Sequence, residues 1–146
     1  MLMEIFRAMD ISANGLQTQR IVVDAISQNL SNVHTTRTEG GGPYRRKQAI
    51  FSAVPLSRKF PDLLFSKMGQ EILEVKVDVV EDARQGQKIY DPTHPDADET
   101  GVVTLPNVNV FEEMVALLGA LRSYEANVTA FQASKQMALK ALEIGK

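Results

Sequence analysis

The chain has no cysteine and no tryptophan, and all six of its prolines fall between residues 34 and 108. The lack of cysteine excludes disulfides, zinc–thiolate centres and thiol catalysis. A long apolar run is also missing, because the longest one, Val115–Leu121, falls far short of the roughly 18 residues that a membrane span requires. We therefore expect a soluble protein without direct membrane insertion.

No charge of one sign dominates the composition. Sixteen basic residues stand against eighteen acidic ones, which gives a net charge of -2. A general nucleic-acid binder needs an excess of Lys and Arg to neutralise phosphates, so nucleic acid is not an expected partner. The first ten residues carry Glu4 and lack the apolar core of a secretory signal, so we expect no cleaved signal peptide.

The N-terminal end is predicted to be a helix with a narrow apolar stripe. Between Ile5 and Val33 there is no proline, and apolar residues recur at a spacing of seven. They are Met9, Leu16, Val23 and Leu30. Because Ser12 and Gln19 interrupt the neighbouring row, burial of this stripe alone hardly offsets the cost of ordering the helix. We expect the terminal helices to be partly disordered until they find partners.

The C-terminal end is predicted to be a longer helix. Asn109 followed by Glu112 is typical of an N-cap with its capping-box partner, and Gly145 stands where a glycine would end the helix. Steps of three and four residues trace a coiled-coil seam that only Lys135 interrupts. The other seam positions are Met114, Leu117, Leu121, Tyr124, Val128, Phe131, Ala138 and Leu142.

Residues 34–108 are predicted to be turn-rich and partly β. A turn is expected at Gly40–Pro43, and short strands at Gln48–Val54 and Val102–Leu105. The clearest strand is Leu73–Val79, whose strict alternation indicates a sheet with one solvated face. The stretch Pro55–Gln70 has no clean period and is expected to be a loop.

The predicted fold class is therefore mainly α with a small β-containing insert. Residues 1–33 and 109–146 form a terminal helical domain in which the two helices pack as an antiparallel pair or coiled coil. Residues 34–108 form the partly β middle region.

Charge is divided within that middle region. Residues 34–70 carry seven basic and two acidic side chains, a net charge of +5, whereas residues 71–108 carry three basic and nine acidic ones, a net charge of -6. The two halves are able to face each other inside one subunit. Alternatively, the positive half of one copy meets the negative half of the next, which would favour the register and rate of assembly.

The segment Asp91–Gly101 is the one dense cluster of potential metal ligands. Its acidic residues imitate the first half of a calcium loop, but the twelfth position, which requires a bidentate Glu, is Asn107. A rigid turn is the simpler interpretation, so we predict no catalytic residue, metal or cofactor. A metal-dependent enzyme remains an alternative, and its candidate residues are Asp91, His94, Asp96 and Asp98.

The two apolar stripes must be buried, and two arrangements do so. In the first, the helices pair only with each other, as in a monomeric coiled-coil adaptor. In the second, apolar surface is left over and copies or homologues pack side by side. Contacts between different faces of successive subunits generate a helical assembly unless the rotation closes.

The run Ala25–Thr36 (AISQNLSNVHTT) resembles the S-x-N-[LI]-[AS]-N-V-x-T signature near the N-terminus of bacterial flagellar rod and hook proteins. Three further stretches are similar to proximal rod proteins of the flagellar basal body rod protein family. They are GGPYRRK from Gly41, YDPTHPDADETGVVTLPNVNVFEEM from Tyr90 and SYEANVTAFQASKQMALKALEIG from Ser123. The similarity covers nearly the whole chain and is weakest between Pro55 and Gln70, and His34 stands where many relatives have Asn.

This resemblance implies a structural, non-enzymatic subunit of the flagellar basal body. Such a subunit passes uncleaved through the flagellar type III export apparatus and stacks into the periplasmic rod, the drive shaft that transmits torque for motility. The implied partners are further copies of the chain, other rod proteins of the FlgB, FlgF and FlgG types, and the rod-base adaptor FliE.

The assembly interface is expected to follow the stripes and the end of the first helix. The interface residues are Met9, Leu16, Val23, Asn29, Leu30, Asn32, Met114, Leu117, Leu121, Tyr124, Val128, Phe131 and Leu142. Asn32 is predicted to cap the helix in a left-handed backbone conformation. Asn29 either bonds a neighbouring chain or helps to end the helix.

Overall fold

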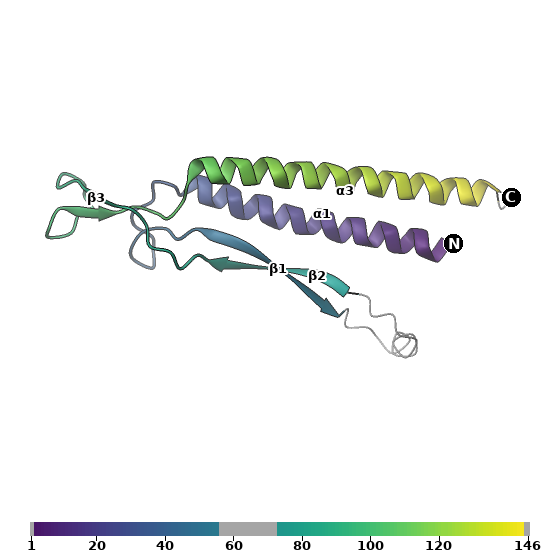
Figure 1. Cartoon of the computed structure of the whole chain (residues 1–146), viewed down its shortest axis with the longest axis horizontal. Coiled ribbons are helices and arrows are strands. Elements are labelled where there is room, and N and C mark those ends of the chain that lie inside the picture. Colours follow the sequence, from purple (N-terminus) through teal and green to yellow (C-terminus); the bar gives the residue numbers. More distant parts are fainter. Residues whose placement is uncertain (1, 56–72, 145–146) are drawn as a thin grey trace. The chain divides into compact units, whose positions relative to one another are not determined.

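The structure is a computed structural model that describes residues 2–55 and 73–144 (Figure 1). Two long helices lie at the ends of the sequence and short strands lie between them, which confirms the predicted fold class. The elements in chain order are α1 (Leu2–Ser31), β1 (Lys47–Pro55), β2 (Leu73–Glu81), β3 (Lys88–Tyr90), β4 (Val102–Thr104) and α3 (Val110–Ile144).

The start of α3 confirms the predicted cap. The side-chain oxygen of Asn109 accepts a hydrogen bond of 3.0 Å from the backbone N–H of Phe111, and Val110 is the first helical residue. The capping box differs from the expected one, because the Asn109 amide donates to the Glu112 carboxylate over 3.2 Å. The predicted glycine stop, Gly145, lies outside the described residues.

The end of α1 is capped by a side chain and not by a left-handed residue. Among the described residues, positive φ angles occur only at glycines, so the predicted left-handed conformation of Asn32 is wrong. Its side-chain amide instead donates 2.9 Å to the carbonyl of Gln28. The same carbonyl also accepts a 3.1 Å hydrogen bond from the Asn32 backbone N–H, so the backbone and the side chain of Asn32 both close the last turn of the helix.

The strands form two small sheets. β1 pairs with β2, which confirms both predicted strands and adds Pro55 to the first of them. The rest of the predicted loop, up to Gln70, lies outside the described residues. Val75 and Val79 of β2 are exposed, so the predicted burial of their face is wrong. A two-stranded sheet has few neighbours with which to cover such a face.

The second sheet is the antiparallel pair of β3 and β4, of which only β4 was predicted. Lys88 lies opposite Thr104, Ile89 opposite Val103 and Tyr90 opposite Val102. The acidic segment 91–101 joins the two strands, and at its end the N–H of Asp91 donates to the carbonyl of Gly101. Gly101 has a φ of 76°, a conformation that side chains disfavour.

The chain divides into two compact units, and both helices contribute to each. The first contains residues up to Thr18, Ile50–Asp78 and the chain from Tyr124 onward. The second contains Gln19–Ala49 and Val79–Ser123. Within each unit the segments of α1 and α3 run antiparallel (Figure 1).

The buried line of α3 is displaced by one residue from the predicted seam at three positions. Glu113, Ala120 and Ser134 are buried where Met114, Leu121 and Lys135 were expected. These side chains are smaller or polar, and small side chains allow two helices to approach closely. Met114, Leu121, Tyr124 and Leu142 of the predicted seam are exposed, whereas Leu117, Val128 and Phe131 are half-buried.

Candidate functional site

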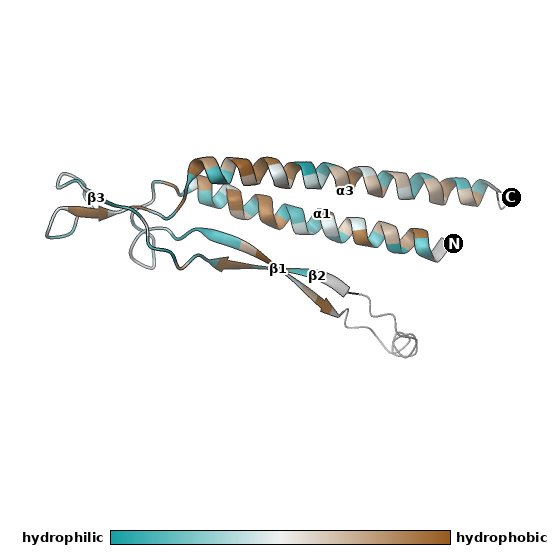
Figure 2. Ribbon diagram, viewed as in Figure 1, coloured by the Kyte–Doolittle hydropathy of each residue, from teal (hydrophilic) through white to brown (hydrophobic). Residues whose placement is uncertain are grey.

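The first turns of α3 present a row of exposed apolar side chains, all in the second unit. We call them the α3 apolar face, and they are Phe111, Met114, Val115, Leu118 and Leu121. Figure 2 shows apolar colouring along this part of the helix. Phe111 is 81% exposed, Val115 70% and Leu118 61%. Exposed apolar side chains that adjoin one another in this way mark an interaction surface.

The same part of α3 has almost no polar side. Leu117 and Ala120 are turned inward, while Ala116 and Gly119 lie on a further exposed side. Nothing lies within 4 Å of the position that a Cβ of Gly119 would occupy. A helix that is apolar around most of its girth is normally enclosed by other elements. This part of α3 is therefore a candidate contact surface.

A buried polar cluster holds the start of this helix. Asn29 of α1 is fully buried, and its amide nitrogen donates to the Glu113 carboxylate over 3.0 Å and to the Lys47 carbonyl over 2.8 Å. Its oxygen accepts from the Tyr44 hydroxyl over 3.0 Å and from the Lys47 N–H over 2.8 Å. A primary amide has two donors and two acceptor positions, so all of the hydrogen-bonding capacity of Asn29 is used within the chain.

Glu113 of α3 is also fully buried, and its second oxygen accepts a 2.6 Å hydrogen bond from the Arg46 guanidinium. We call Asn29, Tyr44, Arg46 and Glu113 the polar latch. Burial raises the pKa of the Tyr44 hydroxyl above its ordinary value of 10.0, and the negative charge of Glu113 raises it further. Tyr44 therefore remains a hydrogen-bond donor, and the latch stays complete at neutral pH.

Asn107 fastens the chain next to the latch. Its oxygen accepts from the Arg46 N–H over 2.7 Å, and its amide donates to the carbonyls of Asp82 and Arg84. Arg84 in turn binds the Asp82 carboxylate with 2.7 Å and 2.8 Å contacts. The latch and Asn107 together fix the orientation of the α3 apolar face within its unit.

The predicted interface residues differ in exposure. Met114, Leu121, Tyr124 and Leu142 are exposed, Asn29 is fully buried, and Met9, Leu16, Val23, Leu30, Asn32, Leu117, Val128 and Phe131 are half-buried. The sequence analysis missed Phe111, Val115 and Leu118. Their spacing of four and three residues is typical of an apolar helix face and could have predicted them. The sequence analysis predicted only one apolar seam on this helix, and these residues form a second one.

The predicted metal cluster is a hydrogen-bonded turn. Asp91 accepts hydrogen bonds from Thr93, and Asp98 from Thr100 and Val102. The Asp96 N–H donates 3.1 Å to the His94 ring. In the part of the chain that the structure describes, no three His, Asp or Glu side chains converge as metal ligands. The metal-dependent enzyme is not supported.

The described helices are also not suited to a bilayer. Neither of them contains a stretch that is both long and apolar enough to cross a membrane.

Comparison with known proteins gives consistent matches. The sequence profile of the family described as "Flagellar basal body rod FlgEFG protein C-terminal" matches residues 99–144. The chain is 43% identical to the flagellar basal-body rod protein FlgC of Bacillus subtilis, over 99% of this chain and 100% of that protein. It is 42% identical to FlgC of Borreliella burgdorferi, over 97% and 98%, and 38% identical to FlgC of Aquifex aeolicus, over 99% and 100%.

Proposed function

The chain belongs to the FlgC family of flagellar basal-body rod proteins and is a structural subunit of the basal body, and we propose that it enters the rod through the α3 apolar face. The observation that carries this proposal is the exposure of Phe111, Val115 and Leu118 on a part of α3 that has almost no polar side. Neither alternative, a metal-dependent enzyme or a monomeric adaptor, is supported.

The size of this face favours a multi-subunit assembly over an isolated pair. Full burial of one such side chain stabilises by roughly 1.5–3 kcal/mol, and the five are still 43–81% exposed. They therefore contribute about 5–9 kcal/mol when a neighbour covers them. Association itself costs about 4–15 kcal/mol, so one such contact barely balances it. A subunit that contacts several neighbours gains the remaining free energy of association.

The half-buried stripe residues of both helices supply the further contacts in this proposal. Met9, Leu16 and Val23 of α1 lie half-exposed along one row, and Leu142 is exposed near the end of α3. In this proposal each of these faces meets a different face of a neighbouring subunit. Such contacts propagate into a helical shaft.

The polar latch gives the shaft its stiffness. Torque applied to α3 reaches α1 and the Lys47 backbone through the hydrogen bonds of Asn29 and Glu113, all within one unit. Buried polar groups with every bond satisfied hold one arrangement. The chain performs this role without catalysis.

The location and the partners follow from the same proposal. The subunit is exported uncleaved through the flagellar type III apparatus and stands in the periplasmic part of the rod. Its neighbours are further copies of itself, rod proteins of the FlgB, FlgF and FlgG types, and the rod-base adaptor FliE.

The test is to place charge on the α3 apolar face of the full chain. Val115→Asp and Leu118→Asp are expected to prevent incorporation into isolated basal bodies and to abolish motility, because a buried unpaired charge costs several kcal/mol. The helical circular-dichroism signal of the purified chain should change little when the chain is dilute. Gln132→Asp, on an exposed polar position of the same helix, serves as the matched control. Normal rods in both face variants would refute the proposal.

A further inference from the structure

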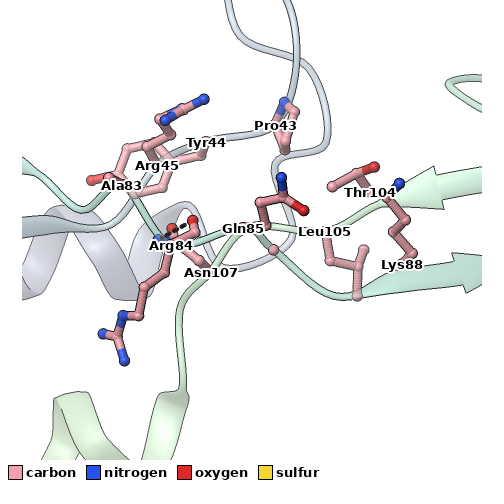
Figure 3. Close-up of a pocket in the computed structure, with 11 residues that line it drawn as sticks. Pro43, Tyr44, Arg45, Ala83, Arg84, Gln85, Lys88, Thr104, Leu105 and Asn107 are labelled. Carbon is pink, nitrogen blue, oxygen red and sulfur yellow. Dashed lines mark hydrogen bonds between the residues drawn. The ribbon is translucent and has the colours of Figure 1, made fainter.

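A pocket of about 270 Å³ opens beside the β3–β4 pair, within the second unit (Figure 3). Its lining comes from residues 43–45, 83–86 and 88, and from residues 104, 105 and 107. Pro43, Ala83 and Leu105 make part of its wall apolar. A side chain at Gly86 would overlap the Leu105 carbonyl, so this wall is backbone packed on backbone. The pocket is therefore preformed.

The charged groups of the pocket are all cations. Arg45, Arg84 and Lys88 belong to its lining, which contains no carboxylate. Arg84 is neutralised by Asp82 through a 2.7 Å contact. Arg45 and Lys88 are exposed, and neither has a carboxylate within 4.0 Å among the described residues. In Figure 3 these two side chains lie on either side of Gln85.

The acidic turn 91–101, also in the second unit, has the opposite character. It carries four carboxylates and no Lys or Arg. Asp91 and Asp98 are occupied by hydrogen bonds from their own turn, and Asp96 accepts a 2.7 Å bond from Thr36. Glu99 is exposed, and no described residue forms a hydrogen bond or ion pair with it. The turn thus presents one free carboxylate on a rigid support.

We propose that the acidic turn of one copy docks in the pocket of the next copy, with the Glu99 carboxylate between Arg45 and Lys88. This inference rests on the proposed function and adds a specific contact between identical subunits. The charges match, and the apolar wall lies in the same pocket as the two cations. Because pocket and turn are different patches of one chain, the contact repeats in one direction, as a ring or helix of copies requires. Charge pairs of this kind fix register more than they add affinity.

Disulfide crosslinking in assembled basal bodies tests the geometry, and the natural chain has no cysteine to interfere. Gln85→Cys combined with Thr100→Cys, at an exposed position that leaves Glu99 in place, is expected to give a ladder of multimers on mild oxidation. Gln85→Cys combined with Glu39→Cys, at an exposed position outside the turn, is the matched control. A ladder absent from the test pair, or equal in both pairs, would overturn the proposal.

Charge exchange tests the pairing itself. Lys88→Glu and Glu99→Lys are each expected to lower incorporation about tenfold, and the double variant should restore most of it. Lys88→Arg should incorporate normally. If the double variant incorporates no better than the single variants, the proposal is contradicted. It is also contradicted if Lys88→Glu lowers incorporation and Glu99→Lys does not, because the pocket would then bind a carboxylate of another protein. Since Val115→Asp and Leu118→Asp report separately on rod entry, these outcomes leave the proposed function intact.

Discussion

Gly15 of α1 lies directly against Asn127 of α3, both in the first unit. A Cβ added at Gly15 would fall 2.8 Å from the side-chain oxygen of Asn127 and 2.9 Å from its Cγ. No larger residue fits at Gly15 unless the Asn127 side chain moves. This close approach explains why the buried line of α3 consists largely of small and polar residues.

Gly15→Ala and Gly119→Ala should therefore have opposite effects. Glycine inside a helix costs about 1 kcal/mol relative to alanine, so both substitutions gain helix propensity. At Gly119, where a Cβ meets nothing within 4 Å, the isolated chain should gain that amount. At Gly15 overpacking of about 1–3 kcal/mol should cancel or exceed it. The helical circular-dichroism signal of the dilute chain and its loss on heating measure both.

Asn127→Ala provides the control for Gly15. The double variant should recover the stability that Gly15→Ala loses, because the obstructing side chain is gone. If Gly15→Ala proved as stabilising as Gly119→Ala, the close helix contact would be wrong.

Much of the fold follows from local patterns in the sequence. The Asn109 cap depends on residues within three positions of it, and β2 depends on a strict alternation, so both were predictable. The short strand β3 was not, because three residues are too few to establish a period. The displacement of the seam was missed because the prediction assumed that the large apolar side chains of α3 are the buried ones. Close packing at Gly15 selects small ones instead.

The polar latch should be sensitive to the loss of Asn29. Asn29→Leu removes four hydrogen bonds and leaves the Glu113 carboxylate and the Tyr44 hydroxyl without this partner. A buried polar group left unsatisfied costs about 1–3 kcal/mol, so a total loss above about 3 kcal/mol is expected. Thermal unfolding followed by circular dichroism measures this loss.

Gln28→Ala is the matched control for the latch. Gln28 precedes Asn29, is exposed and accepts one hydrogen bond from the Lys47 ammonium. Exposed contacts of this kind change stability by about 0.5 kcal/mol or less. Equal effects of the two substitutions would count against the latch.

The latch illustrates what the sequence alone does not disclose. Asn29 was singled out by the family signature, but its partner Glu113 lies 84 positions later. By its position alone, Glu113 is a favourable charge in the first turn of a helix. A buried charge becomes reasonable only when Arg46 and Asn29 are known to surround it. Pairings at such separations leave no local pattern.

Acid should destabilise the acidic turn. A hydrogen bond from the Thr100 hydroxyl lowers the pKa of Asp98 below its ordinary value of 3.8, and one from Thr93 does the same for Asp91. Because these pKa values are lower in the folded state, the stabilisation is fully present above pH 3.8. It is lost as the pH falls below 3.8 and the carboxylates become protonated.

The double variant Asp91→Asn, Asp98→Asn should flatten this acid dependence. Chemical shifts of the turn residues, followed as the pH is lowered, report the transition in both forms. Glu39→Gln, a neutralisation outside the turn, should leave the dependence as it is in the natural chain. An identical acid transition in the double variant would show that other groups cause it.

The helices should gain order when the chain assembles. The buried apolar side chains in the described part of the chain are Ala25, Ile26, Tyr44, Val103 and Ala120. Full burial of a large apolar side chain stabilises the fold by about 1.5–3 kcal/mol, whereas ordering each residue costs about 1–2 kcal/mol. A core of this size therefore leaves the isolated chain marginally stable. The dilute chain should therefore show less helix by circular dichroism than α1 and α3 contain together. Its helical signal should rise with concentration in the natural chain and stay flat in Val115→Asp, because that variant cannot cover the α3 apolar face. Complete helicity in the dilute chain would mean that α1 and α3 are stable without neighbours.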